Sequence, residues 1–203
     1  MDKKLYDLMD WAGIEEIVYS EAADPHKLLG PHITDDGLLI SAFIPTAVMV
    51  TVRLASSGKE FPMELADEAG FFAALIPRKN IPEYTLLVVY DNGTSEELYD
   101  PYAFSPLYTE SDLKKFEAGV HYTIYEKMGA HPMSVNGVEG VYFSVWAPCA
   151  MRVSVVGDFN LWDGRRHQMR RLGDSGIFEL FMPGLASGLI YKYEIKNSHG
   201  EPQ

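Results

Sequence analysis

Two stretches of the chain resemble each other: ISAFIPTAVMVTV at residues 40–52 and FSVWAPCAMRVSV at residues 143–155. They align without a gap, and Phe43 falls opposite Trp146. Each is rich in the β-branched and aromatic residues that favour strands, and each contains a proline that marks a turn. Because an internal repeat of this kind indicates a duplicated unit, we expect two domains of the same fold.

The repeat continues towards the carboxyl terminus. FFAALIP at residues 71–77 matches IFELFMP at residues 177–183, and YTLLVVYDNG at residues 84–93 matches YKYEIKNSHG at residues 191–200. Apolar and polar residues alternate within these stretches, and turn formers separate them, as in antiparallel strands. No strand–helix–strand rhythm appears, which excludes a Rossmann sheet or a complete barrel. The sequence therefore predicts an all-β protein of two tandem immunoglobulin-like antiparallel β-sandwiches.

Helical spacing of apolar residues is confined to short segments at the N-terminus (residues 3–19) and in the linker (residues 111–128). Ahead of that linker helix, DPYAFSP at residues 100–106 combines turn formers with aromatic residues, so we expect it to pack on a neighbour. We place the boundary between the domains here, which gives one module over residues 1–107 and a second over residues 108–203.

Composition excludes several classes of function. The chain has 203 residues, with 17 Lys and Arg against 29 Asp and Glu, and its net charge of −12 argues against a nucleic-acid partner. No apolar run reaches the roughly 20 residues that cross a membrane, and the charged start MDKKLYDLMDWAG is unlike a secretory signal. The single Cys149 and the scattered histidines lack metal-ligand spacing. We therefore expect a cytoplasmic protein without membrane contact, cofactor, metal or catalytic residue.

A family resemblance covers most of the second copy. YEKMGAHPM, VEGVYFSVWAPCAMRVSVVGDFNLWDGRRHQMRR, GIFELFMPGL and YKYEIKNSHGE, within residues 121–201, closely resemble the carbohydrate-binding family 48 module of glycogen branching enzymes. The upstream DPHKLLGPH and YDPYAFSPL are similar to the extra N-terminal module of some bacterial branching enzymes. The resemblance implies the non-catalytic front end of a 1,4-α-glucan branching enzyme, whose catalytic (β/α)8 barrel is missing from this sequence. We expect the chain alone to be inactive.

The loop GDFNLWDG at residues 157–164 is the candidate binding site. Asn160 and Asp163 can cap their own turn, which leaves Trp162 at the apex with its face outward. A flat indole covers the apolar C–H face of glucose while nearby polar groups bind the hydroxyls. Relatives that hold glycogen use a Trp in this loop and a Lys on the later strand, which correspond to Trp162 and Lys192. The predicted carbohydrate-binding residues are Trp162, Lys192, Asn160 and Asp163.

The departures from the family pattern predict weak binding. The first copy has LASSGKEFP at residues 54–62 in place of the loop, so we expect it to act as a spacer or docking module. Glycogen-binding relatives carry a second stacking Trp after the YKY strand, where this chain offers only His199. We expect Trp146, aligned with Phe43 of a copy without the loop, to serve core packing. The clustered Arg165, Arg166, Arg170 and Arg171 are expected to pair with surrounding carboxylates.

Two functions remain open from the sequence. The chain either binds and positions α-glucan near a branching active site, or is a purely structural or protein-interaction module that docks on the missing catalytic barrel. Trp162 is accordingly either an exposed stacking ring or a ring buried against its own domain or that barrel. A third class, an immunoglobulin-like adhesion protein, is disfavoured because no secretion signal is recognisable.

Overall fold

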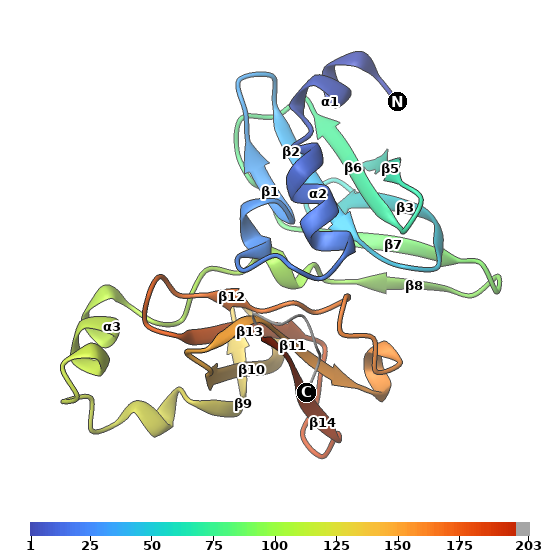
Figure 1. The fold of residues 1–203 in the computed structure, drawn as a ribbon. Coiled ribbons are helices and arrows are strands. Elements are labelled where there is room, and N and C mark those ends of the chain that lie inside the picture. The colour runs from blue at the N-terminus through green and yellow to red at the C-terminus, as the bar shows by residue number, and fades with distance from the viewer. Residues whose placement is uncertain (198–203) are drawn as a thin grey trace. The chain divides into compact units, whose positions relative to one another are not determined.

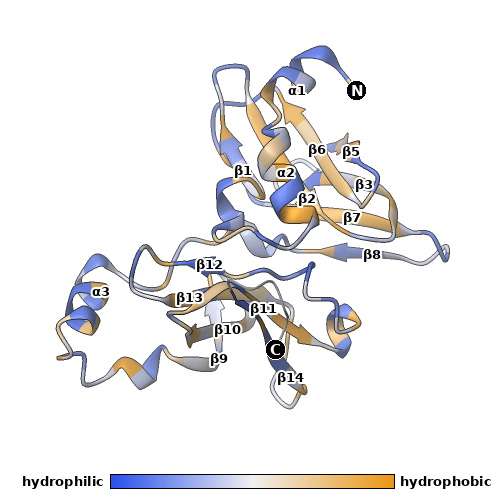
Figure 2. Cartoon of the chain, in the orientation of Figure 1, coloured by the Kyte–Doolittle hydropathy of each residue, from blue (hydrophilic) through white to orange (hydrophobic). Residues whose placement is uncertain are grey.

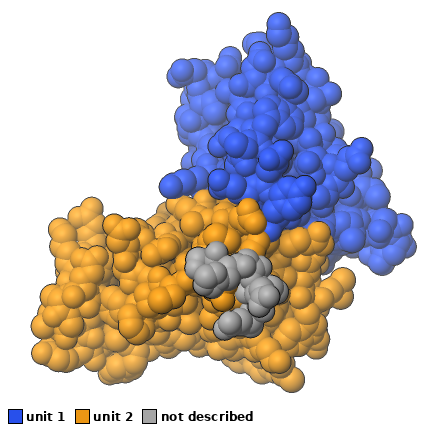
Figure 3. Space-filling view, viewed as in Figure 1, with its two compact units in different colours: residues 1–19, 26–103 blue, residues 20–25, 104–203 orange. Residues whose placement is uncertain are grey.

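A computed structural model describes residues 1–197, and the predicted His199 lies outside them (Figure 1). The chain forms two compact units, the first from residues 1–19 and 26–103 and the second from residues 20–25 and 104 onward (Figure 3). Each unit pairs its strands in antiparallel sheets, and helices are few and short, which confirms the predicted all-β class.

The first unit contains two four-stranded sheets, ordered β1-β2-β6-β5 and β4-β3-β7-β8. Its elements are α1 (Lys3–Leu8), α2 (Trp11–Val18), η1 (Pro25–Lys27), β1 (Gly30–Ile33), β2 (Leu38–Phe43), β3 (Ala47–Leu54), β4 (Glu60–Pro62), β5 (Glu64–Asp67), β6 (Phe71–Ile76), β7 (Tyr84–Tyr90), β8 (Ser95–Leu98) and η2 (Pro101–Ala103).

Apolar side chains from both sheets form the core of the first unit, among them Leu38, Ile40, Val50, Val52, Phe72, Ile76, Leu86 and Val88. In Figure 2, β6 and β7 are orange along most of their length, whereas the exposed edge strand β8 is blue. Nearly every residue of β2 and β6 is buried, so both faces of their sheet are covered. The N-terminal helices bury Leu5, Ile14 and Ile17, and α1 contacts β6.

The second unit contains a four-stranded sheet, β12-β13-β10-β9, and a two-stranded sheet, β11-β14. Its elements are α3 (Glu110–Glu117), η3 (Ile124–Glu126), β9 (Gly129–Val135), β10 (Val138–Trp146), β11 (Ala150–Gly157), η4 (Asp158–Asn160), β12 (Arg170–Arg171), β13 (Ile177–Pro183) and β14 (Tyr191–Asn197).

The two units share one strand topology. The order β1-β2-β6-β5 corresponds to β9-β10-β13-β12 when the repeated sequences are matched, and the pair β3-β7 corresponds to β11-β14. The register agrees as well, because Phe43 pairs with Phe71 where Trp146 pairs with Ile177. Both central pairs carry an irregularity at the same point, between Ala47 and Met49 in β3 and between Ala150 and Arg152 in β11. The predicted similarity of topology is confirmed.

Equivalent histidines support the same conclusion. His32 lies 3.2 Å through Nε2 from the carbonyl oxygen of Leu29, and His131 lies 2.9 Å through Nε2 from the carbonyl oxygen of Met128. Each ring closes the turn that leads into the first strand of its module. Both histidines thus form local hydrogen bonds at equivalent positions of the two modules.

The modules differ at the edges of the smaller sheet. Among the described residues, nothing pairs with β14 in the way that β8 pairs with β7. Along β11, the place of β4 is taken by the segment that follows the loop. There the Val155 N–H donates to the carbonyl of His167 at 3.1 Å, and the Met169 N–H donates to the carbonyl of Val153 at 2.8 Å.

The linker packs on the four-stranded sheet of the second unit. Phe104 stacks edge-to-face on Phe181 with ring centroids 4.7 Å apart, and Tyr108 bonds through its hydroxyl to Ser144 at 2.9 Å. Leu113, Phe116 and Ile124 join the same apolar cluster. The expectation that DPYAFSP packs on a neighbour is confirmed.

A fully buried carboxylate ties the linker to this sheet. Glu179 accepts from the Arg170 guanidinium at 2.8 Å through one oxygen. Its other oxygen accepts from the Leu107 N–H at 3.2 Å and from the Tyr142 hydroxyl. The charge is therefore paired and fully hydrogen-bonded, as burial requires.

A short N-terminal segment, Ser20–Pro25, completes the second unit. The buried Arg152 of β11 donates to the carbonyl of Ser20 at 3.3 Å, to Ser154 at 3.1 Å, and to the carboxylate of Glu194 at 2.8 Å. The Arg171 N–H also donates to the carbonyl of Ala23 at 3.0 Å. The Arg152 guanidinium thus joins Ser20 to Glu194, two residues far apart in the sequence.

The expectation that Trp146 packs in the core is wrong. Its side chain is 56% exposed, whereas the aligned Phe43 is 4% exposed. Trp146 is the last residue of β10, and the linker covers only part of its ring through an edge-to-face contact with Phe116, 6.0 Å between centroids. The truncation Trp146→Ala therefore creates no core cavity.

We expect Arg152→Ala to lower the free energy of unfolding of the second unit by about 3 kcal/mol, because it leaves Glu194 without its charge partner and the Ser20 carbonyl without a donor. Amide hydrogen exchange of β11 and β14, compared with β3 and β7, measures the two units separately. Arg53→Ala, which breaks the exposed pair with Glu60, is the matched control and should leave exchange unchanged. Equal effects of the two substitutions would contradict the assigned role of Arg152.

Candidate functional site

The loop that follows β11 closes around a buried amide. Asn160 has no exposed surface, and its Oδ1 accepts from the Gly157 N–H at 3.0 Å. Its Nδ2 donates to the carbonyl of Val155 at 2.8 Å and to His167 Nδ1 at 2.8 Å. Three bonds from one side chain thus tie the end of η4 to β11 and to the segment that runs beside β11.

Two consecutive residues at the apex adopt left-handed backbone conformations. Leu161 has φ 57° and Trp162 has φ 61°, in a region that costs an L-residue about 1 kcal/mol or more. The Trp162 N–H donates to the carbonyl of Gly157 at 2.9 Å, and the Asp163 N–H donates to the carbonyl of Asn160 at 3.1 Å. These bonds hold the backbone in a conformation that the residue types do not favour, and they fix where the indole emerges.

Trp162 and Lys192 lie together at this apex. The indole Nε1–H donates to the Asp158 carboxylate at 2.8 Å, so the ring has a set orientation while 40% of the side chain stays exposed. The Lys192 ammonium, from β14, lies 5.8 Å from the ring centroid of Trp162, within the range of a cation–π contact. The structure therefore brings an oriented planar ring and an ammonium hydrogen-bond donor together on one surface.

The other two predicted residues organise the loop. Asn160 is buried with its amide engaged, so it cannot reach a ligand from this position. Asp163 accepts from the Arg165 guanidinium at 2.7 Å. Partial burial opposes ionisation of Asp163, but the bonds from Arg165 prevail and hold its pKa below the ordinary value. Pairing of Arg165 with Asp163, and of Arg170 with Glu179, agrees with the sequence expectation for these arginines.

Sequence reasoning missed two residues of the site. Asp158 orients the indole, and a carboxylate four residues ahead of a loop tryptophan was an available signal. His167 accepts from Asn160 through Nδ1 and must stay neutral to do so. Burial, reinforced by the nearby positive charge of Arg166, lowers the pKa of His167 to about 3.

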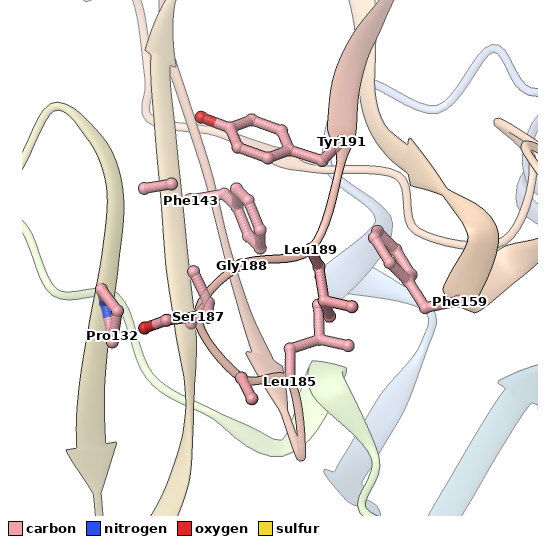
Figure 4. A pocket seen from close by; sticks show the side chains of 11 residues that line it. Pro132, Phe143, Phe159, Leu185, Ser187, Gly188, Leu189 and Tyr191 are labelled. Atoms are coloured by element: carbon pink, nitrogen blue, oxygen red, sulfur yellow. The ribbon is translucent and has the colours of Figure 1, made fainter.

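A separate pocket of about 210 Å³ lies beneath the connection from β13 to β14 (Figure 4). Its lining is apolar, with the rings of Phe143, Phe159 and Tyr191 around Leu185 and Leu189. The only side-chain hydroxyls in that lining belong to Ser187 and Tyr191. A sugar needs several convergent hydrogen-bonding groups, so this pocket suits an apolar group better than a glucan.

No cluster of three or more potential metal-ligating side chains occurs among residues 1–197. Over the same residues, no helix is long and apolar enough to cross a membrane.

Comparison with known families assigns both modules. Residues 10–102 match the model described as alpha-1,4-glucan branching enzyme GlgB, N-terminal domain, and residues 127–203 match carbohydrate-binding module 48 (isoamylase N-terminal domain). The chain belongs to these two module families. The resemblance to the front end of branching enzymes is thereby confirmed, and the loop with Trp162 lies in the family 48 module.

Two relatives are similar to this chain over most of its length. The 1,4-alpha-glucan branching enzyme GlgB of Thermosynechococcus vestitus is 48% identical over 192 residues, covering 92% of this chain and 25% of the relative. That of a Nostoc species is 46% identical over 193 residues, with the same shares of the two chains. The family 48 module and its GlgB-type partner thus span about a quarter of the length of these relatives.

Two solved pullulanase structures are weakly similar to the chain. The pullulanase type I of Bacillus subtilis complexed with maltose is 19% identical, covers 86% of this chain and 24% of its own, and has a TM-score of 0.31. A pullulanase from Anoxybacillus is 15% identical, covers 83% and 24%, and has a TM-score of 0.29.

We expect the family 48 module to lose stability as pH falls. Folding depresses the pKa of His167 from 6.5 to about 3, so the unfolded chain binds one more proton between those values. The contribution of the neutral ring is complete above about pH 6.5 and declines below it, by at most about 1.4 kcal/mol per pH unit.

The measurement is the denaturation midpoint of the second unit at pH 7 and pH 4.5, for the parent and for His167→Gln. The glutamine keeps an acceptor for Asn160 but does not titrate, so its midpoint should depend less on pH. An identical pH dependence in both proteins would show that His167 is not the responsible group.

Proposed function

We propose that the chain is the non-catalytic front end of a 1,4-α-glucan branching enzyme, and that its family 48 module binds α-1,4-glucan weakly at Trp162. The observation that carries the proposal is the indole itself, which is exposed, held by Asp158, and accompanied by the Lys192 ammonium. Stacking needs a ring whose orientation is set before the sugar arrives, because ordering it afterwards costs binding energy. The match to a carbohydrate-binding family supports this reading.

The chemistry of the two side chains fits a glucan. The indole face removes the apolar C–H face of one glucose from water, and the ammonium donates to neighbouring hydroxyls. One ring supplies only a few kcal/mol at about 25 cal/mol per Å² before ordering costs are subtracted. Millimolar affinity, about −4 kcal/mol, is therefore the expected scale.

The first module is proposed to dock or space rather than to bind sugar. Where the second module has the Trp162 loop, the first has a short turn from β3 to β4, residues 55–59, without an aromatic residue. The partner for such docking is the remainder of a longer branching enzyme. Catalysis is proposed to belong to that remainder, and the cytoplasm is proposed as the location.

Docking by the second module is the alternative, and one observation favours it. Leu161 and Ile190 are largely exposed beside the proposed site, where a Cβ on Gly157 would lie 2.7 Å from the carbonyl of Ile190. Exposed apolar side chains from two adjoining loops suit a protein surface better than a sugar. Sugar titration separates the two readings.

We expect Trp162→Ala to abolish binding of maltoheptaose at this loop, and Lys192→Met to weaken it several-fold, since the first removes the stacking face and the second only a donor. Titration calorimetry of residues 1–203 measures both. The matched control is Trp11→Ala, because Trp11 is 38% exposed against 40% for Trp162 but belongs to the first module. A folded Trp162→Ala protein that binds like the parent would exclude this site, and a parent that ignores tens of millimolar sugar would favour docking.

A further inference from the structure

Trp146 is an exposed tryptophan at a defined point of the family 48 module. It ends β10, where it pairs with Ile177 of β13, and more than half of its side chain faces solvent. Within the described strands β10 and β11 and the turn between them, Trp146 is the only large apolar side chain that is exposed. Along these two strands, Trp146 is therefore a single exposed ring and not one of a row of exposed apolar side chains.

The ring is held without being buried. Its Nε1–H donates to the carbonyl of Ser175 at 3.2 Å, and its edge meets Phe116 at an interplanar angle of 74°. The Ser175 turn is itself closed, because Ser175 Oγ donates to the carbonyl of Leu172 at 2.7 Å. Trp146 therefore shares with Trp162 the features that a stacking platform needs: an engaged N–H, a set orientation and an exposed face.

A comparison of the two modules also supports a binding role for Trp146. The first module lacks the Trp162 loop, and its residue at the position of Trp146 is the buried Phe43. The second module has the loop, and there the same strand position carries a larger aromatic ring that is open to solvent. The two modules thus differ at both positions together, as expected if both exposed rings of the second module serve one ligand.

The two rings lie at opposite ends of β11. Trp146 precedes the turn that starts this strand, and the Trp162 N–H bonds to Gly157 at its end. The strand has eight residues, which at about 3.3 Å each makes it about 25 Å long, and one ring emerges near each of its ends. A short oligosaccharide that fills one platform does not reach the other, whereas a polymer can occupy both.

We propose that Trp146 is a second α-glucan platform, so that the family 48 module holds one polymer at two poles. This rests on the proposed function of the module and adds a site to it. The exposed Asp174, next to the Ser175 that holds the ring, supplies carboxylate oxygens to accept from sugar hydroxyls. Two weak sites on one polymer give an avidity that neither has alone.

The direct test follows the three indole N–H resonances of residues 1–203 during titration with maltoheptaose, with each resonance assigned from a Trp→Phe variant. We expect the Trp146 and Trp162 signals to move and the Trp11 signal to stay. In Trp162→Ala, the Trp146 signal should still move with the same midpoint. If only the Trp162 signal moves, the second platform is wrong while the proposed function stands. If neither moves, both are wrong.

Polymer binding gives an independent readout. Trp146→Ala should weaken binding to glycogen by about tenfold while maltoheptaose binding at Trp162 is unchanged, because only the polymer uses both poles. The variant should stay folded, since the ring is exposed, and a thermal melt checks this. Tyr122→Ala, another exposed aromatic of the same unit, is the control and should bind like the parent. Unchanged glycogen binding by folded Trp146→Ala would overturn the proposal.

The only cysteine provides a label near the proposed platform. Cys149 is exposed in the turn between Trp146 and the start of β11. A paramagnetic tag on its thiol should broaden maltoheptaose proton signals in Trp162→Ala, where only the Trp146 platform remains. No broadening beyond that seen with a tagged Trp146→Ala, Trp162→Ala protein would contradict the assignment.

Discussion

The side-chain amide of Asn160 is the interaction on which the candidate site depends. Its bonds to Gly157, Val155 and His167 let Leu161 and Trp162 stay in left-handed conformations that they would otherwise leave. Loss of one buried partner costs about 1–3 kcal/mol, enough to offset the benefit of the remaining bonds. A residue that never touches solvent thus decides whether the indole is presented, and the same amide requires a neutral His167.

The two modules show how one sandwich supports different surfaces. Strand order, register and the irregularity in β3 and β11 are common to both modules. The modules differ instead at the edges of the smaller sheet. In the second module, the residues after Gly157 form the loop and then run beside β11, where β4 lies in the first module. The loop that presents Trp162 is therefore anchored by backbone bonds to the strand that it follows.

Much of this was predictable because strand patterns are local. The alternation in residues 40–52 and 143–155 is enough to place β2, β3, β10 and β11 and to relate the modules. Exposure of Trp146 was not predictable from its alignment with Phe43, because an alignment of two strands does not show which other segments pack on that position. The bond from Arg152 to Ser20 spans 132 residues, and no pattern in either segment announces it. The partners of Asn160 lie only three to seven residues away, but no residue pattern shows that its amide turns inward to meet them.

The most direct test of the account is a search for intermolecular nuclear Overhauser effects between maltoheptaose and residues 1–203. The account predicts contacts from the C–H protons on one face of a glucose ring to the indole protons of Trp162, with weaker ones to the side-chain methylenes of Lys192. Contacts to other residues with none to Trp162, or no contacts at sugar concentrations of tens of millimolar, would contradict the claim that this loop presents a glucan-stacking ring.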